Sequence, residues 1–174
     1  MESQNRQLGH ADHQPARALR PLCIVAEHVA LPANVGSLFR IADAFGVEKL
    51  YLTAGSAVPP HPKLHKTARS CERAVAWEYR ESAAELVATL RAEGYCIVCL
   101  ERSTHSRDLR GFDARGIAKL ALLVGSEKRG VSAELLSAAD HTLHIRMLGQ
   151  NSSLNLATAC AIGVFELSRH QLPE

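Results

Sequence analysis

The sequence predicts an α/β domain with a mostly parallel sheet flanked by helices. Short apolar runs typical of buried strands alternate with segments of helical periodicity along the chain, as in parallel sheets with helical crossovers. The chain has 174 residues, which is enough for one domain with a sizeable core. Residues 1–20 are polar, lack periodicity and contain Pro15. We therefore expect a flexible basic arm there and a single domain over 21–174.

The first part of the domain is predicted to run strand, helix, strand, loop. Residues 22–29, LCIVAEHV, are an apolar strand. Apolar residues then recur at helical spacing from Asn34, and Gly46 ends this helix. Residues 47–54 form the second strand, and the proline-rich stretch 57–63 is a loop.

The middle of the chain contains one helix between two extended segments. Residues 73–80 form a short extended segment, and Ser82 with Glu85 makes a capping box that begins a helix. Gly94 ends that helix, and residues 95–101, YCIVCLE, form the next strand.

The last part of the chain begins after a long polar loop. Residues 119–125 are the most apolar strand, and Ser132 caps a short helix over 133–139. A strand at 141–147 follows, and the last helix is predicted at 153–170.

The composition argues against a membrane protein, a secreted protein or a metal protein. No apolar run is long enough to span a bilayer and the N-terminus does not resemble a signal peptide, so we expect a cytoplasmic protein with no membrane partner. Five cysteines do not indicate a disulfide framework, and Cys96 and Cys99 lie within an apolar strand typical of a core. The nine histidines, including the pair His61 and His65, lack a metal-ligand pattern, so no metal is expected.

The charge pattern leaves two interpretations open. A net charge of +2 is too small to indicate a nucleic-acid partner alone. Most cations are arginines, whose planar donors suit phosphate, and they gather in three places. Solvated surface and polyanion binding therefore both fit these clusters, which are Arg17 and Arg20; Lys63, Lys66, Arg69 and Arg73; and Arg102, Arg107 and Arg110.

Three polar loops follow predicted strands, at the sheet edge where ligands bind in such folds. Each loop alone has an ordinary explanation as a helix cap, a tight turn or a solvated charge. All three should project from the same end of one sheet, so together they indicate one site. Their notable residues are Asn34 and Arg40; Gly125, Glu127 and Gly130; and Gly149, Ser153 and Asn155.

These loops carry a family resemblance. The segments NVGSLFRIADAFGVEKLYLTAG, LLVGSEKRGVS and IRMLGQNSSLNLATACAIGVFEL closely resemble the three ordered motifs of the SpoU/TrmH branch of the SPOUT methyltransferases. The resemblance extends over roughly residues 20 to 170. It implies an S-adenosylmethionine-dependent enzyme that methylates a ribose 2′-hydroxyl in RNA. It also implies a homodimer and a deep trefoil knot formed by the C-terminal segment.

The resemblance also implies which residues form the site. The catalytic set is Arg40, Asn34, Glu127, Asn155 and Ser153. The set expected to bind S-adenosylmethionine is Leu100, Gly125, Ile145, Met147 and Leu154. RNA contacts are expected from Arg17, Arg20, Lys63, Lys66, Arg69, Arg107 and Arg146. Because guanidinium groups stay protonated, we expect Arg40 to hold the phosphate beside the target ribose and to stabilise the developing alkoxide.

Two departures from the family motifs and several alternatives remain, the first departure being SLNLATA in place of the commoner SLNVS. A proline commonly follows the position of Ile145 in the family, whereas this chain has Arg146. By analogy with compact family members, tRNA is favoured over rRNA. The alternatives are a SPOUT enzyme that methylates a base, a catalytically silent RNA-binding dimer, and an unrelated nucleotide-binding enzyme. The last is disfavoured because no dinucleotide glycine fingerprint follows the first strand.

Overall fold

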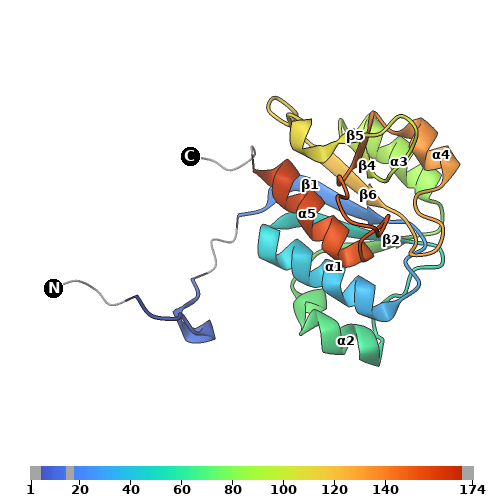
Figure 1. Cartoon of the computed structure of the whole chain (residues 1–174). Helices are drawn as coiled ribbons and strands as arrows, with labels where there is room; N and C mark the ends of the chain where they lie inside the picture. The colour runs from blue at the N-terminus through green and yellow to red at the C-terminus, as the bar shows by residue number, and fades with distance from the viewer. Residues whose placement is uncertain (1–4, 15–17, 170–174) are drawn as a thin grey trace.

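The chain folds around one seven-stranded sheet, shown in Figure 1. This computed structural model describes residues 5–14 and 18–169. The strand order is β3-β2-β1-β6-β4-β7-β5, and each neighbouring pair is parallel. The strands are β1 (Arg20–Ala26), β2 (Val47–Thr53), β3 (Trp77–Arg80), β4 (Cys96–Leu100), β5 (Arg107–Asp108), β6 (Leu120–Val124) and β7 (His141–His144). The predicted α/β class with a parallel sheet is confirmed.

Helices cover both faces of the sheet. The α-helices are α1 (Pro32–Phe45), α2 (Pro62–Ala68), α3 (Ala83–Ala92), α4 (Ala133–Ala138) and α5 (Leu156–Ser168). Three short 3-10 turns are η1 (His10–Asp12), η2 (Cys71–Arg73) and η3 (Leu109–Gly111). In Figure 1, α1 and α5 lie side by side over one face of the sheet, and α3 and α4 lie together on its other side.

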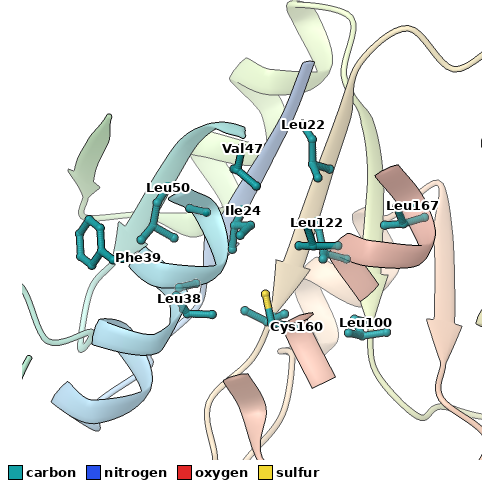
Figure 2. Packing of buried hydrophobic residues seen from close by; sticks show 14 of the residues in the cluster. Leu22, Ile24, Leu38, Phe39, Val47, Leu50, Leu100, Leu122, Cys160 and Leu167 are labelled. Carbon is teal, nitrogen blue, oxygen red and sulfur yellow. The ribbon is translucent and has the colours of Figure 1, made fainter. Parts of the chain in front are cut away.

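The strands alternate their side chains between two apolar clusters, as parallel strands covered on both faces must. In β1, Leu22 and Ile24 point to the α1 and α5 side, while Cys23 and Val25 pack toward α3 and α4. Figure 2 shows the first cluster, in which Cys160 of α5 lies among strand leucines. Small and apolar residues on α5 therefore let this helix approach the sheet closely.

Helix α1 also packs tightly against α2, with Gly36 at the contact. A Cβ atom at residue 36 would lie 2.6 Å from the Leu64 carbonyl oxygen and 2.8 Å from Thr67 Cβ. We expect Gly36→Ala to lower the free energy of unfolding by about 1–3 kcal/mol, because overpacking outweighs the gain in helix propensity. Denaturant unfolding measures this, with Gly111→Ala as the control because a Cβ there meets open space. Equal stability of the two variants would contradict the close packing.

The structure adds two elements to the prediction and moves the ends of several others. The basic stretch contains α2, whose first turn uses Pro62 as its first residue and His61 as its cap; prolines are tolerated at that position, so the proline-rich loop ends earlier than expected. The long loop contains the two-residue strand β5, which is too short for a periodic pattern. Strands β1 and β7 end earlier than predicted, at Ala26 and His144, and β3 begins only at Trp77. Helix α5 begins only at Leu156, after the Asn155 cap.

The remaining sequence predictions concern cysteines, membrane and knot. Cys96 and Cys99 lie on β4 as expected, and burial raises the pKa of the Cys99 thiol to about 12, which makes it a poor nucleophile. Within residues 5–14 and 18–169, no cluster of ligand side chains could hold a metal ion, and no helix is long and apolar enough to cross a membrane. The trefoil knot stays a prediction.

Candidate active site

A cavity of about 420 Å³ lies at the carboxyl ends of β1, β4, β6 and β7. This is the edge at which open parallel sheets bind their ligands. The loops after these strands and the first turn of α5 form its walls. The lining residues are Leu31, Asn34, Leu100, Glu101, Arg102, Val124, Gly125, Ser126, Glu127, Lys128, Gly130, His144, Ile145, Met147, Ser152, Ser153, Leu154, Asn155, Leu156 and Ala159.

Hydrogen bonds join the three motif loops at this cavity. Asn34 at the start of α1 donates from Nδ2 to Glu127 Oε1 at 2.8 Å. Asn155 donates from Nδ2 to Asn34 Oδ1 at 3.1 Å. Glu127 also accepts a hydrogen bond from the Leu31 backbone N–H at 3.4 Å. Buried Asn34 therefore connects the second and third loops through its two amide ends.

Asn155 has a second role as the cap of α5. Its Oδ1 accepts hydrogen bonds from the backbone N–H groups of Ala157 and Thr158, at 3.0 and 3.2 Å. One side chain therefore satisfies orphan donors of the helix with its oxygen and fixes Asn34 with its nitrogen.

We expect Asn155→Ala to lower the free energy of unfolding by about 1–2 kcal/mol, because the cap and the bond to Asn34 are both lost. Asn155→Asp keeps the capping oxygen but loses the donor, so it should be less destabilised than Asn155→Ala. Denaturant unfolding gives the order of the two variants. If Asn155→Asp proves as unstable as Asn155→Ala, the capping role is wrong.

The second motif forms a tight turn that only glycine permits. Ser126 and Gly130 exchange backbone hydrogen bonds of 3.1 and 2.9 Å across it. A Cβ at Gly125 would lie 2.0 Å from the Gly130 carbonyl carbon, and Gly130 has a φ of +67°. Glu101 Oε2 holds the far side of the turn by accepting from Val131 N–H at 3.0 Å. The turn therefore presents its backbone directly to the cavity.

All five residues expected to bind S-adenosylmethionine line the cavity. Gly125 lies in the tight turn, and Leu100 ends β4. Ile145 and Met147 lie past the end of β7, where the chain leaves the sheet, and Leu154 precedes the α5 cap. Their common position agrees with the expected role, which stays a prediction.

Of the expected catalytic residues, Arg40 is the exception. Asn34, Glu127, Ser153 and Asn155 line the cavity. Arg40 is exposed on α1 and does not line the cavity. Arg40 lies six positions after Asn34 on the same helix, and this spacing turns the two side chains to different sides of α1. One chain therefore assembles the expected site without Arg40.

The expected RNA contacts are only partly brought together. Lys63 and Lys66 are exposed on α2, and Arg69 is the C-cap of that helix. Arg146 is exposed in the loop between β7 and α5, at the far end of the sheet from α2. Arg107 is exposed on β5, and its guanidinium lies 2.9 Å from His141 Nδ1.

Two arginines of that set remain, and only Arg20 lies among the described residues. Arg20 donates to the backbone carbonyls of Phe45 and Ser168, at 2.9 and 2.7 Å, and so ties β1 to the ends of α1 and α5. Arg17 lies outside the described residues.

The sequence prediction missed several cavity residues, of which Glu101 is the most important. It follows β4 directly and holds the glycine turn through Val131. Arg102 and Lys128 also line the cavity. The position of Glu101 directly after a buried strand is the sequence feature that could have identified it.

Comparison with known proteins finds relatives that are named as RNA methyltransferases. Among curated proteins, the chain is 30% identical over 159 residues to tRNA (guanosine(18)-2′-O)-methyltransferase of Escherichia coli strain K12, covering 90% of this chain and 66% of that protein. It is 31% identical to the enzyme of the same name from Thermus thermophilus, covering 87% and 76%. It is 29% identical to 23S rRNA (guanosine(2553)-2′-O)-methyltransferase of Bacillus subtilis strain 168, covering 93% and 64%. The chain thus spans about two thirds of the length of several of these relatives.

Solved structures have the same fold. The AdoMet-bound rRNA methyltransferase from Sinorhizobium meliloti matches with a TM-score of 0.81 at 27% identity, over 92% of this chain and 62% of that one. The TrmH/SpoU tRNA modifying enzyme from A. aeolicus matches with a TM-score of 0.78 at 25% identity, over 88% and 77%. The profile of the SpoU rRNA Methylase family matches residues 21–165, which is most of the sheet and all three motif loops. The chain therefore belongs to the SpoU rRNA Methylase family.

Proposed function

We propose that this protein is an S-adenosylmethionine-dependent methyltransferase that acts on a ribose 2′-hydroxyl in RNA. One observation carries the proposal: the three motif loops meet at one cavity and are hydrogen-bonded together through Glu127, Asn34 and Asn155. Relatives named as 2′-O-methyltransferases support ribose as the acceptor.

The cavity fits the methyl donor in size and in chemistry. Its volume of about 420 Å³ lies in the range of small-molecule sites. Apolar side chains and the Gly125 backbone would hold the adenosyl group, and the carboxylates of Glu101 and Glu127 suit the cationic part. Bound there, S-adenosylmethionine supplies an electrophilic methyl group on a sulfonium.

The active unit is proposed to be a homodimer in which a second copy contributes Arg40. One chain does not bring its own Arg40 to the cavity, although it contains the rest of the expected set. Exposed apolar side chains near the cavity and along α5 provide surface for a second copy. They are Leu31, Leu154, Ile162 and Phe165, the last of which packs edge-on against Phe45 of α1.

In this arrangement, the chain's own residues place the acceptor and stabilise its charge. Arg40 holds the phosphate next to the target ribose and stabilises the developing alkoxide electrostatically, and the proton leaves through phosphate or water. Asn34 and Glu127 orient that arginine. Holding the two reactants in the correct geometry can lower the activation barrier by roughly 7–11 kcal/mol.

The RNA is proposed to be a tRNA, bound in part by the cationic surface of α2. Relatives named for tRNA guanosine methylation support tRNA over rRNA, for which another relative is named. Lys63, Lys66 and Arg69 provide phosphate contacts. An enzyme with such a substrate would act in the cytoplasm.

Methylation of RNA from a strain that lacks the protein tests the proposal. Labelled S-adenosylmethionine and the purified protein should transfer label to a 2′-O-methylated nucleotide in the tRNA fraction, identified by nuclease digestion and mass spectrometry. Label on a base would assign the protein to the base-methylating alternative. Donor binding and RNA binding without any transfer would indicate a silent RNA-binding dimer.

A further inference from the structure

A second cavity of about 580 Å³ lies apart from the motif loops, between the proline-rich loop, α2, η2 and β3. It shares no lining residue with the first cavity. The residues that line it are Pro59, Pro60, His61, Pro62, Leu64, His65, Glu72, Arg73 and Trp77. Prolines and one tryptophan make most of this wall apolar, and a single carboxylate lies within it.

That carboxylate, Glu72, is only half satisfied. Its side chain is 9% exposed, and Oε1 accepts a hydrogen bond from His65 Nδ1 at 2.6 Å. Oε2 is buried and has no hydrogen-bond partner among the described residues. The bond from His65 lowers the pKa of Glu72, so the carboxylate is ionised at neutral pH and can only accept. An unpaired buried carboxylate oxygen is costly, and a rotation of the Glu72 side chain that turns Oε2 toward the cavity would let a ligand N–H satisfy it.

The second feature of the cavity is an aromatic wall. Trp77 is half-buried, and its ring packs at right angles to Phe39, with ring centroids 6.1 Å apart. This contact fixes the tryptophan from the core side. The cavity thus contains a held aromatic ring of the kind on which nucleic-acid bases stack.

The third feature is the charge around the cavity. Lys63, Lys66 and Arg69 are exposed on or next to α2, and Arg73 lines the cavity itself. A cationic peptide side chain could also donate to Glu72, but these four positive charges would repel it. An anionic ligand with N–H donors on an aromatic ring suits all three features: its ring can stack on Trp77, its N–H groups can donate to Glu72, and its negative charge suits the four cations.

We propose that this second cavity binds one unpaired RNA nucleotide whose base carries an exocyclic amino group. The amino group donates to Glu72 Oε2, the base packs against Trp77, and the backbone phosphates face Arg73 and the α2 cations. Uracil fits poorly because two carbonyl oxygens flank its N3–H and would face the carboxylate. This proposal rests on RNA being the substrate, and it assigns a recognition site distinct from the site of methyl transfer.

Fluorescence of Trp77, the only tryptophan in the chain, reports binding directly. We expect oligocytidylate to quench it and to bind about tenfold more tightly than oligouridylate of equal length, a preference typical of one specific base contact. Glu72→Gln should abolish the preference while binding of oligouridylate stays equal or rises, because one negative charge is removed. Glu85→Gln is the matched control, since Glu85 is exposed on α3, and it should keep the preference.

Equal affinities in the wild-type protein, or a preference that survives Glu72→Gln, would overturn the proposal. Thermal unfolding of both variants checks that the fold is intact, and Arg73→Ala provides a second variant that should weaken both oligonucleotides equally. Quenching by a cationic peptide without any response to RNA would assign the cavity to a protein partner and would also overturn it.

The same protein preparation separates this inference from the proposed function. Donor binding by calorimetry and label transfer to RNA depend on the first cavity, whereas base preference depends on the second. Transfer without base preference would reject only the nucleotide site. Base preference without donor binding would reject the methyltransferase and leave the second cavity as an RNA-binding site.

Discussion

Arg40→Ala is expected to lower the rate of methyl transfer by roughly a thousandfold while leaving the affinity for S-adenosylmethionine nearly unchanged. The rate falls because a fixed positive charge that faces developing negative charge is typically worth about two to three orders of magnitude. Donor affinity stays because the proposed role of Arg40 is to contact the RNA acceptor, and the residues expected to bind the donor line the cavity without it. Single-turnover rates and calorimetry measure the two quantities. Arg115→Ala, which removes an exposed arginine paired with Asp113, is the control.

Mixed dimers can show which copy provides Arg40. An Arg40→Ala chain has an intact cavity, and a Gly125→Val chain has an intact arginine but a disrupted cavity. If Arg40 acts across the dimer, a random equal mixture should recover about one quarter of the wild-type activity, because half of the dimers contain one complete site out of two. No recovery would show that Arg40 acts on its own chain. A large loss of donor affinity in Arg40→Ala would contradict the assigned role altogether.

Gly125→Ala should weaken donor binding strongly. A Cβ at this position would lie 2.0 Å from the Gly130 carbonyl carbon and 2.1 Å from the Val131 nitrogen, which are backbone atoms that cannot move away separately. The turn must open, and the backbone that faces the cavity is displaced. We expect the affinity for S-adenosylmethionine to fall at least about a hundredfold, a loss on the scale of a removed hydrogen-bonding surface. Isothermal calorimetry measures it.

Gly149→Ala is the matched control for this loss. Gly149 lies in the third motif loop, and a Cβ there meets nothing within 4 Å. This variant should bind the donor with nearly wild-type affinity. If Gly125→Ala also binds normally, the tight turn does not support the donor site, and the proposed cavity is wrong.

Apolar runs and the turn residues between them were sufficient to predict every strand of the sheet except β5. The apolar runs at β1, β2, β4 and β6 are continuous because both faces of these strands are covered, and such runs are recognisable without a structure. The α2 helix was missed because prolines dominate the residues just before it and because its seven residues include only two buried ones, Leu64 and Ala68. Two buried positions are too few to produce a periodic pattern.

The candidate site was predictable only through the ordered motifs. Their positions after strands imply a common edge, and the resemblance identifies individual residues such as Gly125 and Asn155. Local patterns could not reveal that Asn34 would bond both other loops, since 93 and 121 residues separate these partners along the chain. The orphan oxygen of Glu72 was equally hidden, because burial of one carboxylate oxygen depends on the packing of α2, η2 and β3.

The double use of the Asn155 amide has a thermodynamic consequence for the C-terminus. Its oxygen holds the first turn of α5, and its nitrogen holds Asn34 at the cavity. Ligand binding in the cavity and formation of the first turn of α5 are therefore linked equilibria. A ligand that stabilises the hydrogen bond between Asn155 and Asn34 must also stabilise the helical state of α5. Saturating ligand should accordingly slow deuterium uptake by the amides of α5 as well as by the loops, and a protease that cleaves a frayed α5 should act more slowly on the liganded protein.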